Sequence, residues 1–117
     1  MATAEDVRRI VGTLPGAVEK AAWGQPCFRV RDKIFASLDD DDAVLGFSID
    51  RDERTGLIAS DPDTYFLKPG HDDRYHFARA RLARLDEAEL VEILTAAWRR
   101  IAPATQVRAF DAEHPSP

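Results

Sequence analysis

Apolar residues recur at helical spacing near the start of the chain. Thr3, a residue type that caps helix N-termini, stands just before them. Asp6 follows three residues later and completes a pattern that resembles a capping box. We therefore predict a helix over residues 4–13. The apolar positions of its inner face are Val7, Ile10, Val11 and Leu14.

A second and wider helical stripe lies near the other end. Asp86 is suited to cap it, Glu89 completes a capping box, and Pro103 ends it. The apolar positions are Leu90, Val91, Ile93, Leu94, Ala97, Trp98 and Ile101. Both tryptophans, Trp23 and Trp98, are predicted core residues with the indole N–H bonded to a backbone carbonyl; the alternative for Trp23 is ligand stacking.

Between residues 27 and 49 the period changes to two, which is typical of half-buried strands. Phe28 and Val30 share one face of a first strand. After a turn at Asp32-Lys33 a second strand is predicted to bury Ile34, Ala36 and Leu38. A third strand runs over 44–49, after the run Asp39-Asp40-Asp41-Asp42, which predicts a solvated loop. Three short-linked strands predict an antiparallel meander.

The remaining segments give weaker patterns. We predict a short turn of helix within 17–22, a helix over 50–58, a short apolar segment at 64–67 and a further strand at 74–82. The sum is an α+β fold: an antiparallel sheet, made of a β-meander plus a further strand, with N- and C-terminal helices packed on one face.

Length and charge narrow the class of protein. The 117 residues fit one domain, predicted over 1–103, with a polar, Pro-containing and loosely ordered tail at 104–117. The net charge of −5 argues against strong nonspecific binding of nucleic acid. A single Cys27, no signal-peptide pattern and no long apolar run predict a cytoplasmic protein without membrane contact.

A basic ribbon is the first candidate site. Arg29, Arg31 and Lys33 lie on the predicted hairpin, and Arg79 and Arg81 extend the patch if the last strand lies beside it. Such cations contact phosphates in nucleic-acid complexes. They equally form the wet face of an ordinary half-buried sheet.

The second candidate site is a small-ligand or metal pocket made of Trp23, Cys27 and His71. It requires these three side chains to lie close together in the fold. Each has a structural alternative: a core indole, a half-buried thiol, and a histidine bonded to a loop carbonyl. We find no metal-ligand spacing, no cofactor motif and no catalytic motif, so we expect no metal, no cofactor and no enzyme activity.

Several short motifs resemble the MmcQ/YjbR family of small bacterial proteins, over roughly residues 5–103. They are Leu14-Pro15-Gly16, Trp23-Gly24 with Pro26, Phe28-Arg29-Val30, Lys33-Ile34-Phe35-Ala36, Asp61-Pro62, Tyr65-Phe66, Pro69, His71, Arg81-Leu82, Asp86, Glu89-Leu90 and Ala97-Trp98-Arg99. The chain departs from the family pattern at Lys68-Pro69-Gly70-His71, where Pro usually precedes His directly, and at Ala78 and Ala80.

The resemblance implies an α+β fold compared with CyaY-like and type III secretion chaperone-like folds. It also implies the DNA-binding role inferred for the family from a double-wing shape, and it carries over no catalytic residue. We accordingly predict a non-catalytic DNA-binding protein that uses Arg29, Arg31, Lys33, Arg79 and Arg81. The alternatives are a protein-interaction module that uses a sheet face or edge, and the small-ligand or metal pocket.

Overall fold

The computed structural model describes residues 1–39 and 41–114, apart from the side chain of Asp73. Asp40, in the predicted solvated loop, and residues 115–117 of the predicted tail lie outside the described residues. The helices are α1 (Ala4–Val11), α2 (Arg51–Ser60), α3 (Glu87–Ile101) and α4 (Ala104–Glu113), with short 3-10 helices at Asp72–Arg74 and Leu82–Arg84. The strands are β1 (Val18–Glu19), β2 (Cys27–Val30), β3 (Lys33–Asp39), β4 (Val44–Ser48), β5 (Tyr65–Phe66) and β6 (Phe77–Arg81).

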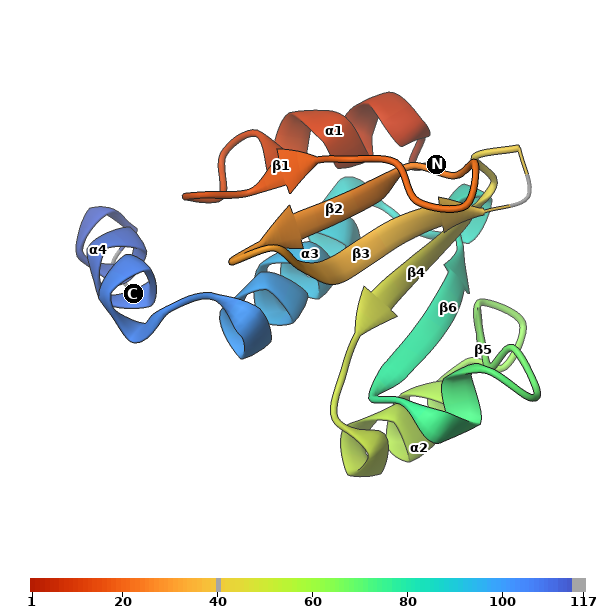
Figure 1. Cartoon of the computed structure of the whole chain (residues 1–117). Coiled ribbons are helices and arrows are strands. Elements are labelled where there is room, and N and C mark those ends of the chain that lie inside the picture. Colours follow the sequence, from red (N-terminus) through yellow and green to blue (C-terminus); the bar gives the residue numbers. More distant parts are fainter. Residues whose placement is uncertain (40, 115–117) are drawn as a thin grey trace.

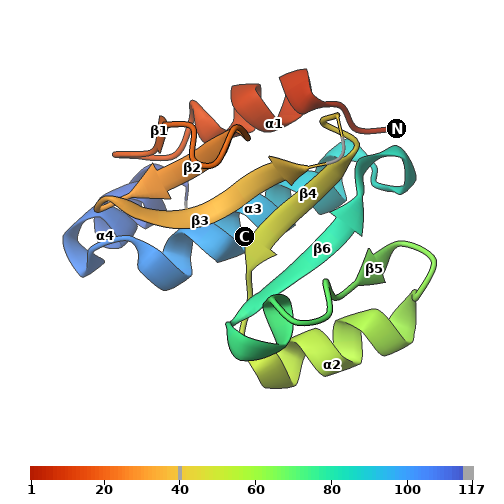
Figure 2. The ribbon, with the colours of Figure 1, turned by 45° about the vertical axis from the view of Figure 1, so that its right-hand side comes forward.

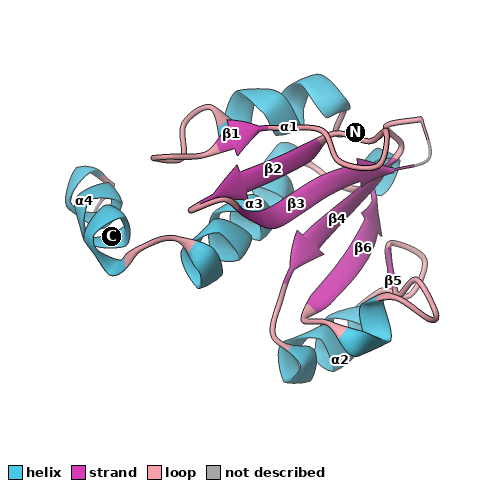
Figure 3. Ribbon diagram, viewed as in Figure 1, coloured by secondary structure: helices cyan, strands magenta, loops and turns pink. Residues whose placement is uncertain are grey.

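All six strands form one antiparallel sheet with the order β1-β2-β3-β4-β6-β5 (Figures 1 and 3). Helix α3 lies behind β3 and β4, and α1 packs on α3 (Figures 1 and 2). No described helix covers the other side of the central strands, which we call the open face. The predicted α+β class, with the N- and C-terminal helices on one side of the sheet, is confirmed.

Both predicted capping boxes are present. The Thr3 side chain accepts from the backbone N–H of Asp6, and the Asp6 carboxylate accepts from the backbone N–H of Thr3. Asp86 and Glu89 do the same at the start of α3. Each such cap stabilises its helix by about 1 kcal/mol.

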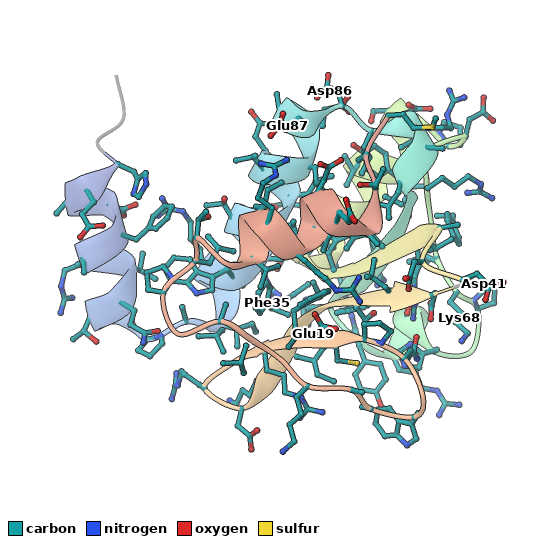
Figure 4. All side chains as sticks on the ribbon, turned by 90° about the horizontal axis from the view of Figure 1, so that it is seen from above. Glu19, Phe35, Asp41, Lys68, Asp86 and Glu87 are labelled. Atoms are coloured by element: carbon teal, nitrogen blue, oxygen red, sulfur yellow. The ribbon has the colours of Figure 1, made fainter. Side chains whose placement is uncertain are left out.

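Ion pairs tie α1 to its neighbours. Arg8 pairs with Glu19 of β1 at 3.0 Å, and Arg9 pairs with Glu87 at the start of α3 at 2.9 Å. Figure 4 shows Glu19 and Glu87 on opposite sides of α1, with Phe35 inside the molecule. The pairs are exposed, so they orient α1 more than they stabilise it.

The hairpin of β2 and β3 carries a bulge that changes which residues are buried. Phe28 pairs with Ala36, but Arg29 pairs with Ile34, so Phe35 is the extra residue. Phe35 enters the core at 0% exposure, whereas Ile34 is turned to the open face. The prediction that Ile34 faces the core is therefore wrong, while Ala36 and Leu38 are buried as predicted.

The predicted helical turn within 17–22 is wrong. Residues 18–19 form the strand β1, because they pair with β2.

The prediction of a loose tail is also wrong where the structure describes it. Residues 104–113 form the helix α4. Phe110 packs on the fully buried Trp98, with ring centroids 5.2 Å apart, and Arg99 pairs with Asp111 across the connection. Val107 and Phe110, three residues apart, are the sequence signal for this helix.

Candidate functional site

The open face holds a cleft of about 870 Å³, which we call the open-face cleft. One wall is the turn before β2, the opposite wall is the loop that joins β5 to β6, and the end of α3 closes one side. Its apolar lining residues are Trp23, Cys27, Ile34, Tyr75, Phe77 and Ile101. Its polar lining residues are Gln25, Ser37, Ser48, Lys68, His71, His76, Arg79 and Arg100.

The floor of the open-face cleft is one row of residues across the sheet, and this row contains the small residues Ser37 and Gly46. Ser37 pairs with both Cys27 and Gly46, and Gly46 pairs with Arg79. Side chains of such a row stand on the same face of the sheet. The space above Gly46 is filled from its neighbours, since a Cβ there would lie 2.6 Å from Ser37 Oγ and 2.7 Å from Phe77 Cε2.

Gly46→Ala is therefore expected to destabilise the protein by about 1–3 kcal/mol, because the Phe77 ring must leave the floor. The matched control is Gly56→Ala in α2, where nothing lies within 4 Å of an added Cβ. That change should stabilise by about 0.5–1 kcal/mol, the helix-propensity difference. Urea unfolding of both variants measures the contrast, and equal effects would contradict this view of the floor.

A buried ion-pair network supports the wall made by residues 68–76. Asp72 has 0% exposure and accepts from Arg79 Nε at 3.0 Å, from Arg79 Nη2 at 3.2 Å and from the backbone N–H of Lys68 at 2.9 Å. Arg79 also pairs with Asp39. Burial raises the pKa of Asp72, but the hydrogen bonds from Arg79, His71 and Lys68 outweigh it, so the pKa lies below the ordinary aspartate value.

Arg54 of α2 holds the same loop from outside the cleft. Its Nη1 donates to the carbonyl oxygens of Asp72 at 2.7 Å, Tyr75 at 2.9 Å and Phe77 at 2.8 Å. The side chain is buried, with 8% exposure for the residue. One guanidinium thus satisfies three loop carbonyls, which fixes where Tyr75 and Phe77 stand in the cleft.

The two cleft histidines each use Nδ1 for a contact with the protein. His71 Nδ1 lies 2.7 Å from Asp72 Oδ1, and the ring N–H donates a hydrogen bond to this carboxylate oxygen. His76 Nδ1 lies 3.3 Å from the backbone N–H of Arg51 and 3.9 Å from Asp50 Oδ2. Nε2 of each ring is therefore the nitrogen left to meet a ligand.

Trp23 stands on a tight turn with a backbone conformation rare for its residue type. Ala22 and Gln25 exchange two backbone hydrogen bonds of 3.0 and 3.1 Å, and Trp23 and Gly24 between them have φ of 51° and 77°. A non-glycine residue there costs about 1–2 kcal/mol. Trp23 is also 90% exposed, so the prediction that it is a core residue is wrong. Trp98 is buried and donates to the carbonyl of Pro15 at 3.0 Å, as predicted.

The structure brings the three predicted pocket residues, Trp23, Cys27 and His71, onto the open-face cleft. His71 contacts a carboxylate, so the expectation of a loop carbonyl is wrong. Cys27 is buried, and that burial raises the pKa of its thiol. A raised pKa keeps the thiol protonated and makes it a poor nucleophile.

The structure divides the predicted basic ribbon. Arg79 is 4% exposed and neutralised by two carboxylates, so the expectation that it contacts phosphate from an exposed face is wrong. Arg29 is half-buried and lies in β2 near one end of the open face. Arg81 lies in β6 at the other end, separated from Asp39 by Val44 of β4, and stacks on Phe66 at 4.3 Å. Figure 1 shows β3 and β4 between β2 and β6. Exposed Arg31 and Lys33 remain at the hairpin tip.

Asp39 is a further correction to the predicted solvated loop. It is the last residue of β3, and its half-buried carboxylate accepts from Arg79. Asp41 and Asp42 are exposed in the turn, as predicted.

Two contributors to the site were missed by sequence reasoning. Arg54 carried no signal, since it is one charged residue in a polar helix. Asp72 is adjacent to His71 in the sequence, but nothing in the sequence pairs it with Arg79, which is predicted as an exposed cation of the basic ribbon. Within residues 1–39 and 41–114, no group of three His, Cys, Asp or Glu side chains is arranged to hold a metal ion. Among the helices described, none has the length and apolar character needed to cross a membrane.

Comparison with known proteins places this chain in a family. The family model described as YjbR matches residues 12–100. Uncharacterized proteins of Mycobacterium bovis and Mycobacterium tuberculosis are 33% identical over 125 residues, which covers 94% of this chain and 96% of each relative.

The crystal structure of Deinococcus radiodurans protein DR2400, with the family-model domain DUF419, matches with a TM-score of 0.77 and 19% identity, over 100% of this chain and 91% of that chain. At that identity the likeness shows the fold. The sequence matches go further, and the chain belongs to the YjbR family.

Proposed function

We propose that this protein is a non-catalytic binding protein that takes a small molecule with a planar ring in the open-face cleft. The observation that carries the proposal is the cleft itself, whose volume of about 870 Å³ is that of a small-molecule site. Three aromatic residues, Trp23, Tyr75 and Phe77, line it together with eight polar residues. This mixture orients a ligand and also buries its surface.

The strain at Trp23 supports the same function. An exposed indole in a left-handed backbone conformation costs stability without burying apolar surface. Indole offers a large, rigid stacking surface, so a ligand that covers Trp23 recovers the missing burial. Burial raises the pKa of the Cys27 thiol, which supports a lining role for this residue over a nucleophilic one.

The test is a titration with two dyes that share one ring system, neutral N-phenyl-1-naphthylamine and anionic 8-anilino-1-naphthalenesulfonate. We expect saturable one-to-one binding of at least one dye to the wild type, measured by dye emission. Ser37→Phe puts a ring on the cleft floor and should weaken binding by about tenfold or more, because the site is filled. The control is Ser60→Phe at the exposed end of α2, which should bind like the wild type. Failure of both dyes to bind, or equal binding to both variants, would overturn the proposal.

Nucleic-acid binding through the hairpin is the second candidate. Arg31 and Asp32 form a rigid two-residue turn with φ of 55° and 62°, and exposed Arg31 and Lys33 project from it. Among the described residues, neither cation has a carboxylate within 4 Å. A preorganised tip with two free cations is the one feature of this surface that favours a phosphate backbone.

Anisotropy of a short labelled duplex tests this candidate. If the hairpin tip makes two phosphate contacts, raising the salt from about 50 to 200 mM should weaken binding about tenfold. Arg31→Ala with Lys33→Ala should remove most of that salt dependence, whereas Arg108→Ala on α4 should not. No salt-dependent binding at micromolar protein would rule the candidate out.

A further inference from the structure

We propose that the ligand of the open-face cleft is a planar organic anion, held through its acidic group by Arg100 and through its ring by Trp23. This rests on the proposed function and names the class of ligand. The carboxylates and sulfonates of aromatic molecules and the phosphates of nucleotides share this chemistry.

The charge of the lining is the first argument. The chain has 21 acidic and 16 basic residues, yet none of the lining residues that the structure describes is an aspartate or glutamate. Three lining residues, Lys68, Arg79 and Arg100, are permanently basic, and two more are histidines. Since Arg79 is paired with carboxylates below the surface, Lys68 and Arg100 are the permanent charges that the described lining offers to an anion, and a low-dielectric wall strengthens their attraction.

The ion pairs that these cations form with carboxylates indicate which cation is available to bind the ligand's acidic group. Arg79 is neutralised by Asp39 and Asp72, so it is part of the framework. Lys68 and Arg100 have no carboxylate within 4 Å among the residues described. Lys68 lies at the side of the molecule away from α4, with its side chain exposed (Figure 4).

Arg100 is the better placed of the two. Its Nη1 donates to Ser48 Oγ at 2.8 Å, which holds a guanidinium from the end of α3 against the end of β4. A guanidinium held by one nitrogen still presents further N–H groups that match carboxylate, sulfonate or phosphate oxygens. Asp50 lies 3.9 Å from His76 Nδ1 and offsets part of the positive charge of both His76 and Arg100. The hydrogen bond from the backbone N–H of Asp52 lowers the pKa of Asp50, and these two positive charges lower it further. Arg100, which has no carboxylate within 4 Å among the described residues, remains the group that carries the selectivity for anions.

The aromatic residues of the two opposite walls suit the ring of the ligand. Trp23 lines the cleft from the turn, and His71 and Tyr75 line it from the loop wall, with their own ring centroids 5.3 Å apart. Because Asp72 engages Nδ1 of His71, Nε2 is free to accept a hydrogen bond from the ring substituents of the ligand.

The two dyes separate this inference from the proposed function, because they differ only by the sulfonate. The wild type should bind the anionic dye about tenfold or more tightly than the neutral one. Arg100→Ala should abolish that preference without changing the affinity for the neutral dye. Lys68→Ala should reduce it by less than about twofold, as a solvent-screened charge at a distance does. The control Arg108→Ala, an exposed cation of α4 outside the cleft, should leave it unchanged.

Emission from Trp23 gives a second measurement in the same titration. Trp98→Phe leaves Trp23 as the sole tryptophan, and its emission should be quenched as the anionic dye saturates. Equal affinity for both dyes, or a preference that survives Arg100→Ala, overturns the inference while the proposed function stands. Failure of both dyes to bind overturns the proposed function itself.

Discussion

Asp72→Asn is expected to destabilise the protein by about 3–5 kcal/mol, because it removes the buried charge that faces Arg79. Asp72 is fully buried and accepts two hydrogen bonds from that guanidinium. With asparagine at position 72, Asp39 is the remaining described carboxylate that pairs with Arg79. The asparagine amide also places N–H groups against the N–H donors of Arg79 and Lys68. The free energy of unfolding in urea measures the loss.

The pH dependence of that loss follows from the lowered pKa of Asp72. A carboxyl group with a lower pKa in the folded state stabilises the protein above its unfolded pKa. This stabilisation disappears as the pH falls through the folded-state value. The difference between the wild type and Asp72→Asn should therefore shrink in acid.

Two further variants complete this test. Asp63→Asn changes an exposed aspartate and should cost less than about 0.5 kcal/mol. The double variant Asp72→Asn with Arg79→Leu should recover part of the stability, since it leaves no uncompensated cation in the network. A double variant less stable than either single one would show that the two residues act independently.

Arg54→Met is expected to cost about 2–4 kcal/mol and to loosen the loop wall of the cleft. The substitution keeps an apolar stem but leaves the carbonyls of Asp72, Tyr75 and Phe77 without their shared donor. Urea unfolding gives the free energy, and hydrogen exchange of residues 68–76 reports the loosening.

Arg51→Ala, on the same helix, is the matched control for Arg54→Met. Arg51 is exposed, and alanine keeps the backbone N–H that His76 accepts. The change should stay within about 0.5 kcal/mol, with exchange of the loop unchanged. Equal effects of the two arginine substitutions would contradict the role assigned to Arg54.

Local patterns predicted much of this fold. The caps at Thr3 and Asp86, the helices behind them and the alternation of Phe28 and Val30 all depend on near neighbours in the chain. The bulge at Phe35 does not, because it is defined by the pairing of two strands. It moved Ile34 to the open face, which alternation within one strand cannot show.

The candidate site was harder to predict for the same reason. Trp23, Cys27 and His71 were selected individually, and only the strand order brings them to one cleft. Arg79 looked like a surface cation, because its sequence neighbours say nothing of Asp39, forty residues away. Burial of a charge depends on distant partners, so a residue type and a strand position cannot establish it.

The two outermost strands of the sheet have a consequence for self-association. β1 and β5 each contain two residues, so the central strands are covered on both sides by very short ribbons. Short edges offer few unpaired N–H and C=O groups to a foreign strand, which is how natural sheets avoid growing into aggregates. Growth of the sheet by addition of a strand from a second copy is thus disfavoured, because the outermost ladder has two residues on either side.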